Sequence, residues 1–135
     1  LDFGAIKVLD DSYNASPDSM IAALDLLASL PGARKVAILG EMLELGDSSA
    51  AEHRRVGDYA ARVADLVVAT GPMAADYADG AERGRALVRA VARDEAPRFL
   101  QPGDVVLIKG SRGAAMDELL PTLEDAAKRM KDPVA

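Results

Sequence analysis

Hydrophobic and polar positions follow two different periods along the chain. Four short β-rich or apolar runs have the length of strands, at residues 6–10, 35–40, 65–70 and 105–109. Between them, apolar residues recur every three or four positions and predict helices at 17–30, 47–64 and 116–130. Shorter helices are expected at 73–78 and 94–100. This alternation predicts an α/β domain with a mostly parallel sheet and helices on both faces.

Some boundaries carry clear signals and others do not. Ser16 is a good N-cap ahead of Pro17, and Ser48 or Ser49 can cap the second long helix. The weakest region fits either a helix at 82–91 or a fourth strand at 86–91. The last five residues, 131–135, are expected to fray.

Composition narrows the class of protein. The chain has 135 residues, half of them hydrophobic and 28% charged, as in one ordinary globular domain. It has no cysteine, which excludes disulfides and zinc–thiolate sites and permits a cytoplasmic location. A net charge of −6 argues against nonspecific nucleic-acid binding, and no apolar run reaches the roughly 18 residues of a membrane span. We therefore expect neither nucleic acid nor membrane as a partner.

Three loops follow strands directly, at 10–16, 40–46 and 109–113. Ligands bind at the carboxyl ends of strands in such sheets, so these loops are the candidate site. In the first loop, the acids Asp10 and Asp11 suit ribose hydroxyls, and Tyr13 and Asn14 suit an adenine. The alternative is a capped turn, because these residue types form such turns without any ligand.

The last of these loops is rich in groups that bind anions. Lys109, Ser111 and Arg112 place two cations and a hydroxyl beside glycines and ahead of a helix. Arginine binds phosphate or carboxylate bidentately, and a helix N-terminus adds positive potential. The alternative is a solvated loop whose glycines serve backbone geometry. The phosphate-binding pattern GxxxxGK[ST] is absent from the sequence.

The remaining candidates favour structural interpretations. The apolar loop at 40–46 is expected to fold back on the core. His53, the only histidine, is expected to be a surface or half-buried helix residue without the partners of a metal site. The acid pairs Glu41/Glu44 and Asp117/Glu118 are expected to be solvated.

Three long segments carry a family resemblance. They are DDSYNASPDSM at 10–20, GEMLELG at 40–46 followed by EHRRVG at 52–57, and GDVVLIKGSRG at 103–113. In this order they resemble the C-terminal domain of the Mur ligases, in the branch that adds D-alanyl-D-alanine to UDP-N-acetylmuramoyl-tripeptide in peptidoglycan synthesis. The resemblance covers nearly the whole chain and is poorest at 75–101.

The resemblance implies a Rossmann-like, three-layer domain over residues 1–135 and a longer parent enzyme. Its N-terminal domain would bind the UDP-sugar, and a central ATPase domain would hold ATP and Mg²⁺. In that family ATP phosphorylates the carboxylate of the precursor, and the amine of the incoming substrate displaces the phosphate. The C-terminal domain closes over the nucleotide and helps to seat the dipeptide, so this chain alone is expected to be inactive.

The family pattern also implies roles for single residues. Asp11 would face the ribose, with Tyr13 and Asn14 close to the nucleotide. Across the cleft, the bound substrates would face three residues of the last loop: Lys109, Ser111 and Arg112. None of these would be catalytic. The residues by themselves leave a second interpretation open, in which the chain is a free-standing α/β ligand-binding or interaction module.

Overall fold

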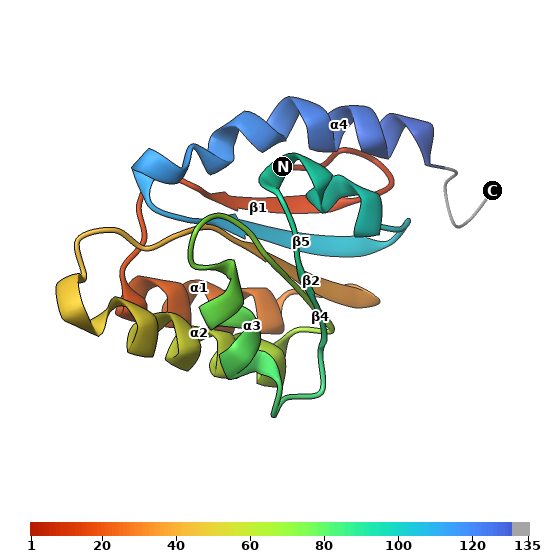
Figure 1. Ribbon diagram of the computed structural model, residues 1–135. Helices are drawn as coiled ribbons and strands as arrows, with labels where there is room; N and C mark the ends of the chain where they lie inside the picture. The colour runs from red at the N-terminus through yellow and green to blue at the C-terminus, as the bar shows by residue number, and fades with distance from the viewer. Residues whose placement is uncertain (131–135) are drawn as a thin grey trace.

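Five parallel strands form a single sheet in the order β1-β5-β2-β3-β4 in the computed structural model, which describes residues 1–130 (Figure 1). The strands are β1 (Lys7–Asp11), β2 (Arg34–Leu39), β3 (Leu66–Ala69), β4 (Leu87–Ala90) and β5 (Asp104–Lys109). The α-helices are α1 (Pro17–Ser29), α2 (Ser49–Val63), α3 (Ala74–Ala81) and α4 (Leu119–Arg129). Short 3₁₀ turns are η1 (Gly46–Ser48), η2 (Arg93–Phe99), η3 (Arg112–Ala114) and η4 (Met116–Glu118).

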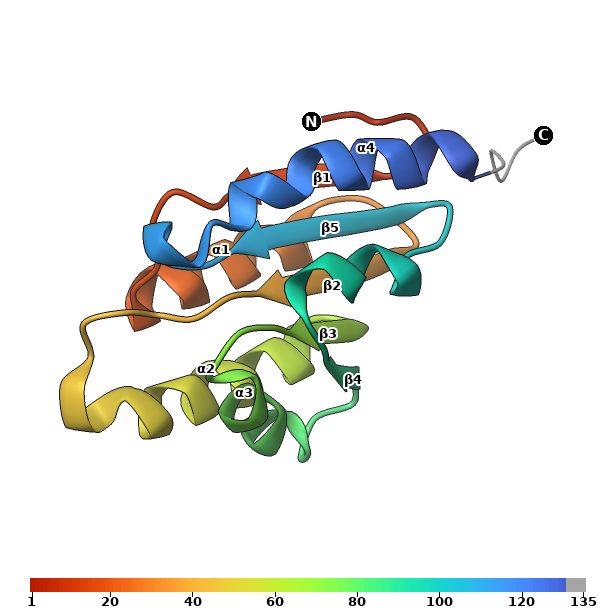
Figure 2. The ribbon, with the colours of Figure 1, turned by 45° about the horizontal axis from the view of Figure 1, so that its top comes forward.

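The helices cover both faces of the sheet, as expected. One core lies between the sheet and α1, α2 and α3, and a second lies between the sheet and η2 and α4. Figure 2 shows the strands side by side, with β5 between β1 and β2. The chain crosses from β4 over the η2 face to reach this central position, which completes the three-layer, Rossmann-like architecture.

Strand register brings the loop-bearing ends of the sheet level with one another. Asp11 pairs with Lys109 across β1 and β5, and Leu39 pairs with Lys109 across β2 and β5. From β1 the chain leaves toward the α1 face, whereas from β5 it leaves toward the α4 face. Adjacent strands whose connections diverge in this way open a crevice at their carboxyl ends. The fold therefore creates a ligand-sized opening at the tips of β1 and β5.

Two glycines let α2 and α3 pack backbone against backbone. A Cβ added at Gly57 would lie 2.1 Å from the carbonyl oxygen of Tyr77, and one at Gly80 would lie 1.9 Å from the carbonyl oxygen of Arg54. No larger residue fits such a contact without moving a helix. This close approach places the Tyr77 ring 4.8 Å, centroid to centroid, from that of His53.

One of the two expected helix caps is confirmed and the other is wrong. Ser16 caps α1 through a reciprocal capping box with Ser19. Neither Ser48 nor Ser49 caps α2, because Ser48 already has helical backbone angles and its hydroxyl donates to the Leu45 carbonyl. No helix within residues 1–130 is long and apolar enough to cross a membrane. The fraying expected at 131–135 lies outside the described residues.

The ambiguous region resolves into a strand followed by 3₁₀ turns. Of the two alternatives, the strand is correct, since β4 pairs with β3 at the edge of the sheet. The helix expected at 94–100 is 3₁₀ rather than α, and Pro97 lies inside it. A proline lacks the N–H that an α-helix interior requires, which accounts for the tighter, shorter turns.

Candidate binding site

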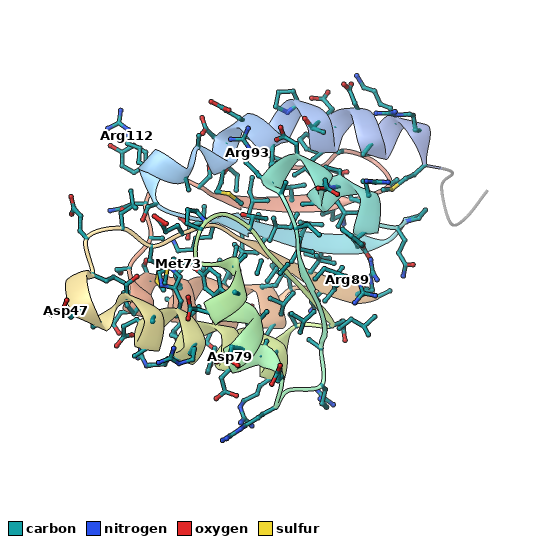
Figure 3. All side chains as sticks on the ribbon, in the orientation of Figure 1. Asp47, Met73, Asp79, Arg89, Arg93 and Arg112 are labelled. Atoms are coloured by element: carbon teal, nitrogen blue, oxygen red, sulfur yellow. The ribbon has the colours of Figure 1, made fainter. Side chains whose placement is uncertain are left out.

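The loops after β1 and β5 meet at the crevice. The Arg112 guanidinium carbon lies 5.5 Å from the centre of the Tyr13 ring, and Figure 3 shows Arg112 projecting beyond the edge of the sheet. An open groove of about 380 Å³ lies beside them. Its lining comes from the two loops and the start of the last helical segment: Asp10, Asp11, Ser12, Tyr13, Arg112 and Asp117. Candidate residues from separate ends of the sequence thus share one groove.

A buried lysine joins the two loops beneath this groove. Lys109 is only 2% exposed, and its Nζ donates to Oδ2 of Asp11 at 2.8 Å and to the carbonyl of Asn14 at 2.9 Å. The Asp11 side chain is 46% exposed, so its carboxylate is held from below and still reaches solvent. Lys109 therefore orients Asp11 and lies behind the surface that a ligand would touch.

The capped-turn interpretation describes part of the first loop well. Oδ1 of Asp10 accepts from the hydroxyl of Ser12 at 2.5 Å and from its backbone N–H at 3.2 Å. The Asn14 side chain accepts from the N–H of Ala15 at 2.8 Å. Tyr13, by contrast, is 73% exposed. The turn is self-supporting, and it presents an aromatic ring to the groove.

Ser111 is also buried, and it binds the loop at 109–113 to the loop at 40–46. Its Oγ accepts from the N–H of Leu43 at 2.7 Å, and its N–H donates to the carbonyl of Glu41 at 2.8 Å. Met42 is 1% exposed, so the loop at 40–46 folds back on the core as expected. Of the three residues proposed from the last loop, only Arg112 is exposed.

The expectation for His53 is wrong, because the residue is fully buried. Its ring accepts from the N–H of Met42 at 3.0 Å and lies edge-on to Tyr77. A signal was present in the sequence: His53 lies three residues before Val56 and seven before Ala60, on the buried stripe of α2. The polar side chain of His53 led to the prediction of an exposed or half-buried residue at a position that belongs to the core.

A second cleft of about 460 Å³ opens on the other side of the segment at 110–116. Its lining comes from the ends of four strands and includes Glu41, Thr70, Arg93 and Met116. Arg93, labelled in Figure 3, donates to the Ala115 carbonyl at 2.9 Å and pairs with Glu118 at 3.0 Å. Its hydrogen bond to Asp94 raises the pKa of Arg93, so the guanidinium stays charged. Sequence reasoning missed Arg93, which follows the ambiguous strand.

The acidic residues show no arrangement suited to a metal. Glu44 and Asp117 are exposed, as expected, whereas Glu41 is half-buried and exposed Glu118 pairs with Arg93. Within residues 1–130, no three His, Cys, Asp or Glu side chains cluster closely enough to hold a metal ion. The described residues therefore form no metal site of three or more such side chains.

The fold and the groove define an α/β domain whose strand tips bring an aromatic ring, a carboxylate and a guanidinium together in one open groove. Comparison with known proteins gives the family. Residues 2–112 match the model of the Mur ligase, glutamate ligase domain, and the chain belongs to that family.

Curated relatives share one activity by name. The chain is 40% identical to the UDP-N-acetylmuramoyl-tripeptide–D-alanyl-D-alanine ligase of Treponema pallidum and 38% identical to that of Escherichia coli. The alignments cover 88% and 87% of this chain. The chain spans only 28% and 27% of the length of these two relatives.

Solved structures agree with the family. MurF from Acinetobacter baumannii superposes with a TM-score of 0.78 at 36% identity, covering 87% of this chain and 28% of that one. The MurF ligase from Thermotoga maritima, in complex with ADP, gives a TM-score of 0.75 at 27% identity, covering 93% and 29%. The expected architecture is thereby confirmed by proteins whose structures are known.

Proposed function

We propose that this chain is the nucleotide-covering and substrate-seating domain of an ATP-dependent ligase. The complete enzyme would join D-alanyl-D-alanine to UDP-N-acetylmuramoyl-tripeptide in the cytoplasm, with the domain's own N-terminal and central domains as partners. The observation that carries the proposal is the shared groove of Asp11, Tyr13 and Arg112, in a family whose matched members carry this activity in their names. The ADP complex of the Thermotoga maritima relative supports a nucleotide ligand.

The groove has the chemistry that a nucleotide requires. The half-exposed carboxylate of Asp11 accepts hydrogen bonds from ribose hydroxyls, and Lys109 keeps it oriented. The exposed ring of Tyr13 offers a stacking surface for the base, with Asn14 shaping the turn beneath it. Arg112 binds a phosphate oxygen pair with two parallel N–H donors. ATP supplies the phosphoryl group, and these residues hold and cover it.

The second cleft suits the incoming dipeptide. D-Alanyl-D-alanine carries an ammonium group at one end and a carboxylate at the other. Glu41 and Arg93 supply one opposite charge for each end, and Ser111 fixes the backbone of the segment between the two clefts. In this arrangement, Lys109 and Ser111 act on the substrates by positioning neighbouring groups.

The proposed reaction assigns no bond-breaking step to this chain. The γ-phosphoryl group of ATP passes to the precursor carboxylate, the dipeptide amine attacks the acyl carbon, and phosphate leaves as the amide forms. An acyl phosphate is readily hydrolysed, so a cap that excludes water protects it. Arg112 would stabilise charge on the phosphoryl oxygens. We assign Mg²⁺ to the central ATPase domain of the complete enzyme and give it no step in this domain.

The deciding experiment uses the complete protein with ATP, UDP-N-acetylmuramoyl-tripeptide and D-alanyl-D-alanine. We expect phosphate release that depends on all three and yields the pentapeptide product. Turnover with a single amino acid in place of the dipeptide would assign the chain to another member of the family. The 135-residue chain alone should show no turnover and only weak ATP binding, so tight magnesium-dependent ATP binding by it would contradict the proposal.

A further inference from the structure

His53 is held by hydrogen bonds on both ring nitrogens. Nε2 lies 3.0 Å from the backbone nitrogen of Met42, and Nδ1 lies 2.7 Å from the carbonyl oxygen of Ser49. The Met42 N–H can only donate, so Nε2 accepts, and Nδ1 therefore carries the proton that it donates to Ser49. These contacts require one tautomer of a neutral ring.

The peptide group between Glu41 and Met42 is bonded on both sides. Its N–H donates to His53, and its carbonyl oxygen accepts from the N–H of Ser111 at 2.8 Å. Donors therefore point in one direction from Ser111 through this peptide and His53 to Ser49, and aligned hydrogen bonds of this kind strengthen one another. This chain of bonds links the start of α2 to the tip of β5.

Tyr77 fixes the preceding peptide in the same loop. Its hydroxyl donates to the carbonyl of Gly40 at 2.7 Å, and its ring packs edge-on against His53 at an interplanar angle of 71°. Burial, with a smaller contribution from the charge of Glu41, raises the pKa of Tyr77, so the hydroxyl remains a protonated donor. The two peptide groups that flank Glu41 are thus both anchored from the helical face.

We propose that His53 is a positioning residue that sets the backbone of Glu41 and Ser111, and through them the wall between the two clefts. Met42 and His53 are buried, so loss of the acceptor leaves an N–H without water or protein to receive it. Glu41 lines the second cleft, and Ser111 precedes Arg112 in the first. The kinetic consequence rests on the proposed ligase function, whereas the structural consequence does not.

Two amide side chains separate the position of the acceptor from polarity alone. His53→Gln places an amide oxygen near the site of Nε2 and can still accept from Met42. His53→Asn reaches only the site of Nδ1 and leaves Met42 without an acceptor. Val56→Ala is the control for stability, because Val56 is buried one turn further along the same face of α2 and bonds to neither loop.

The first measurement is hydrogen exchange in the complete protein. His53→Asn should speed amide exchange at least tenfold in peptides covering 40–46 and 110–116, relative to peptides covering β5. His53→Gln should stay within threefold of the parent in all of them. Val56→Ala should change loops and strand together. Equal exchange in the Asn and Gln variants, or the same local loosening in Val56→Ala, would overturn the proposal.

The second measurement is the steady-state kinetics of the same variants. We expect His53→Asn to lower kcat/KM for the dipeptide at least tenfold and to raise KM for ATP by a smaller factor, because Glu41 belongs to the peptide that His53 binds and Arg112 is reached only through Ser111. His53→Gln should stay close to the parent. An Asn variant with parental kcat/KM would refute the positioning role. If the parent enzyme has no ligase activity and the variants still show the expected exchange pattern, the proposed function is refuted and the role of His53 stands.

Discussion

Two cross-strand ion pairs at opposite ends of the sheet differ in which partner is buried. Arg34 and Asp104 are register partners across β2 and β5 at the amino end, and Asp11 and Lys109 are partners across β1 and β5 at the carboxyl end. In the first pair the carboxylate is completely buried, whereas in the second it is the cation that is buried and the carboxylate is 46% exposed. The buried member of the pair is therefore the anion at the amino end of the sheet and the cation at the carboxyl end.

The amino-end pair is closed. Asp104 accepts two bonds of 2.8 Å from Arg34 and one of 2.9 Å from the N–H of Gln101, and Arg34 also donates to the Phe99 carbonyl. Its hydrogen bond to Asp104 raises the pKa of Arg34. At the carboxyl end, Lys109 leaves its partner Asp11 facing a groove. The fully hydrogen-bonded pair of Arg34 and Asp104 stabilises the fold, whereas the pair of Lys109 and Asp11 orients a carboxylate that still faces the groove.

The largest expected effect comes from Arg34→Met. The substitution keeps most of the side-chain volume and leaves the Asp104 carboxylate buried without its cation. Removing one partner of a buried pair costs about 3–5 kcal/mol, so the free energy of unfolding should fall by that amount. Denaturant titration measures it, and kinetics at a temperature where the variant is folded should match the parent. A loss below about 1 kcal/mol would show that the pair is not a structural clamp.

Arg112→Ala should have the next largest effect, on activity alone. The side chain is exposed, so stability should stay within about 0.5 kcal/mol of the parent. Turnover or substrate affinity of the complete enzyme should fall at least about tenfold, because an arginine facing a transferred phosphoryl group can contribute about 10³-fold to the rate. Initial rates at varied ATP and dipeptide concentrations measure it. Activity within a factor of two of the parent would remove Arg112 from the site.

The contrast between the two pairs explains what the sequence could predict. The order of strands and helices along the chain, and the position of the β1 and β5 loops at the same edge of the sheet, follow from local patterns and the geometry of parallel sheets. That β1 and β5 are neighbouring strands is shown only by the structure. Arg34 and Asp104 are 70 residues apart, and only the register of β2 on β5 brings them together. No periodicity contains that information.

The burial of polar side chains is harder to predict from sequence than the order of the elements. Lys109 and Ser111 look like exposed ligands in sequence, because a loop of charged and hydroxyl residues between glycines has the same composition whichever way its side chains point. Their burial depends on neighbouring loops. The Asp11 carboxylate and the Asn14 carbonyl accept hydrogen bonds from Lys109, and the N–H of Leu43 donates to the hydroxyl of Ser111. β4 was ambiguous because an exposed edge strand lacks the continuous apolar run of a central one.

Lys109→Met tests the open pair with the same substitution type as Arg34→Met. Asp11 stays hydrated when its partner is removed, so the loss of stability should be at most about 1 kcal/mol. The carboxylate loses its fixed orientation, and KM for ATP should rise about fivefold, which corresponds to about 1 kcal/mol. Denaturation and ATP titration of the complete enzyme give both numbers. A stability loss as large as that of Arg34→Met would erase the distinction between the two ends of the sheet.

Tyr13→Ala should give the smallest change and the cleanest separation of binding from folding. The ring is 73% exposed, and the Arg112 guanidinium carbon lies 5.5 Å from its centre, a contact worth about 0.5 kcal/mol in water. Unfolding should therefore be unchanged within that amount, while loss of the stacking surface should raise KM for ATP about threefold. Tyr13→Phe is the matched control, because it keeps the ring and should behave as the parent. If Phe and Ala raise KM equally, the hydroxyl rather than the ring meets the nucleotide, and the base must lie elsewhere in the groove.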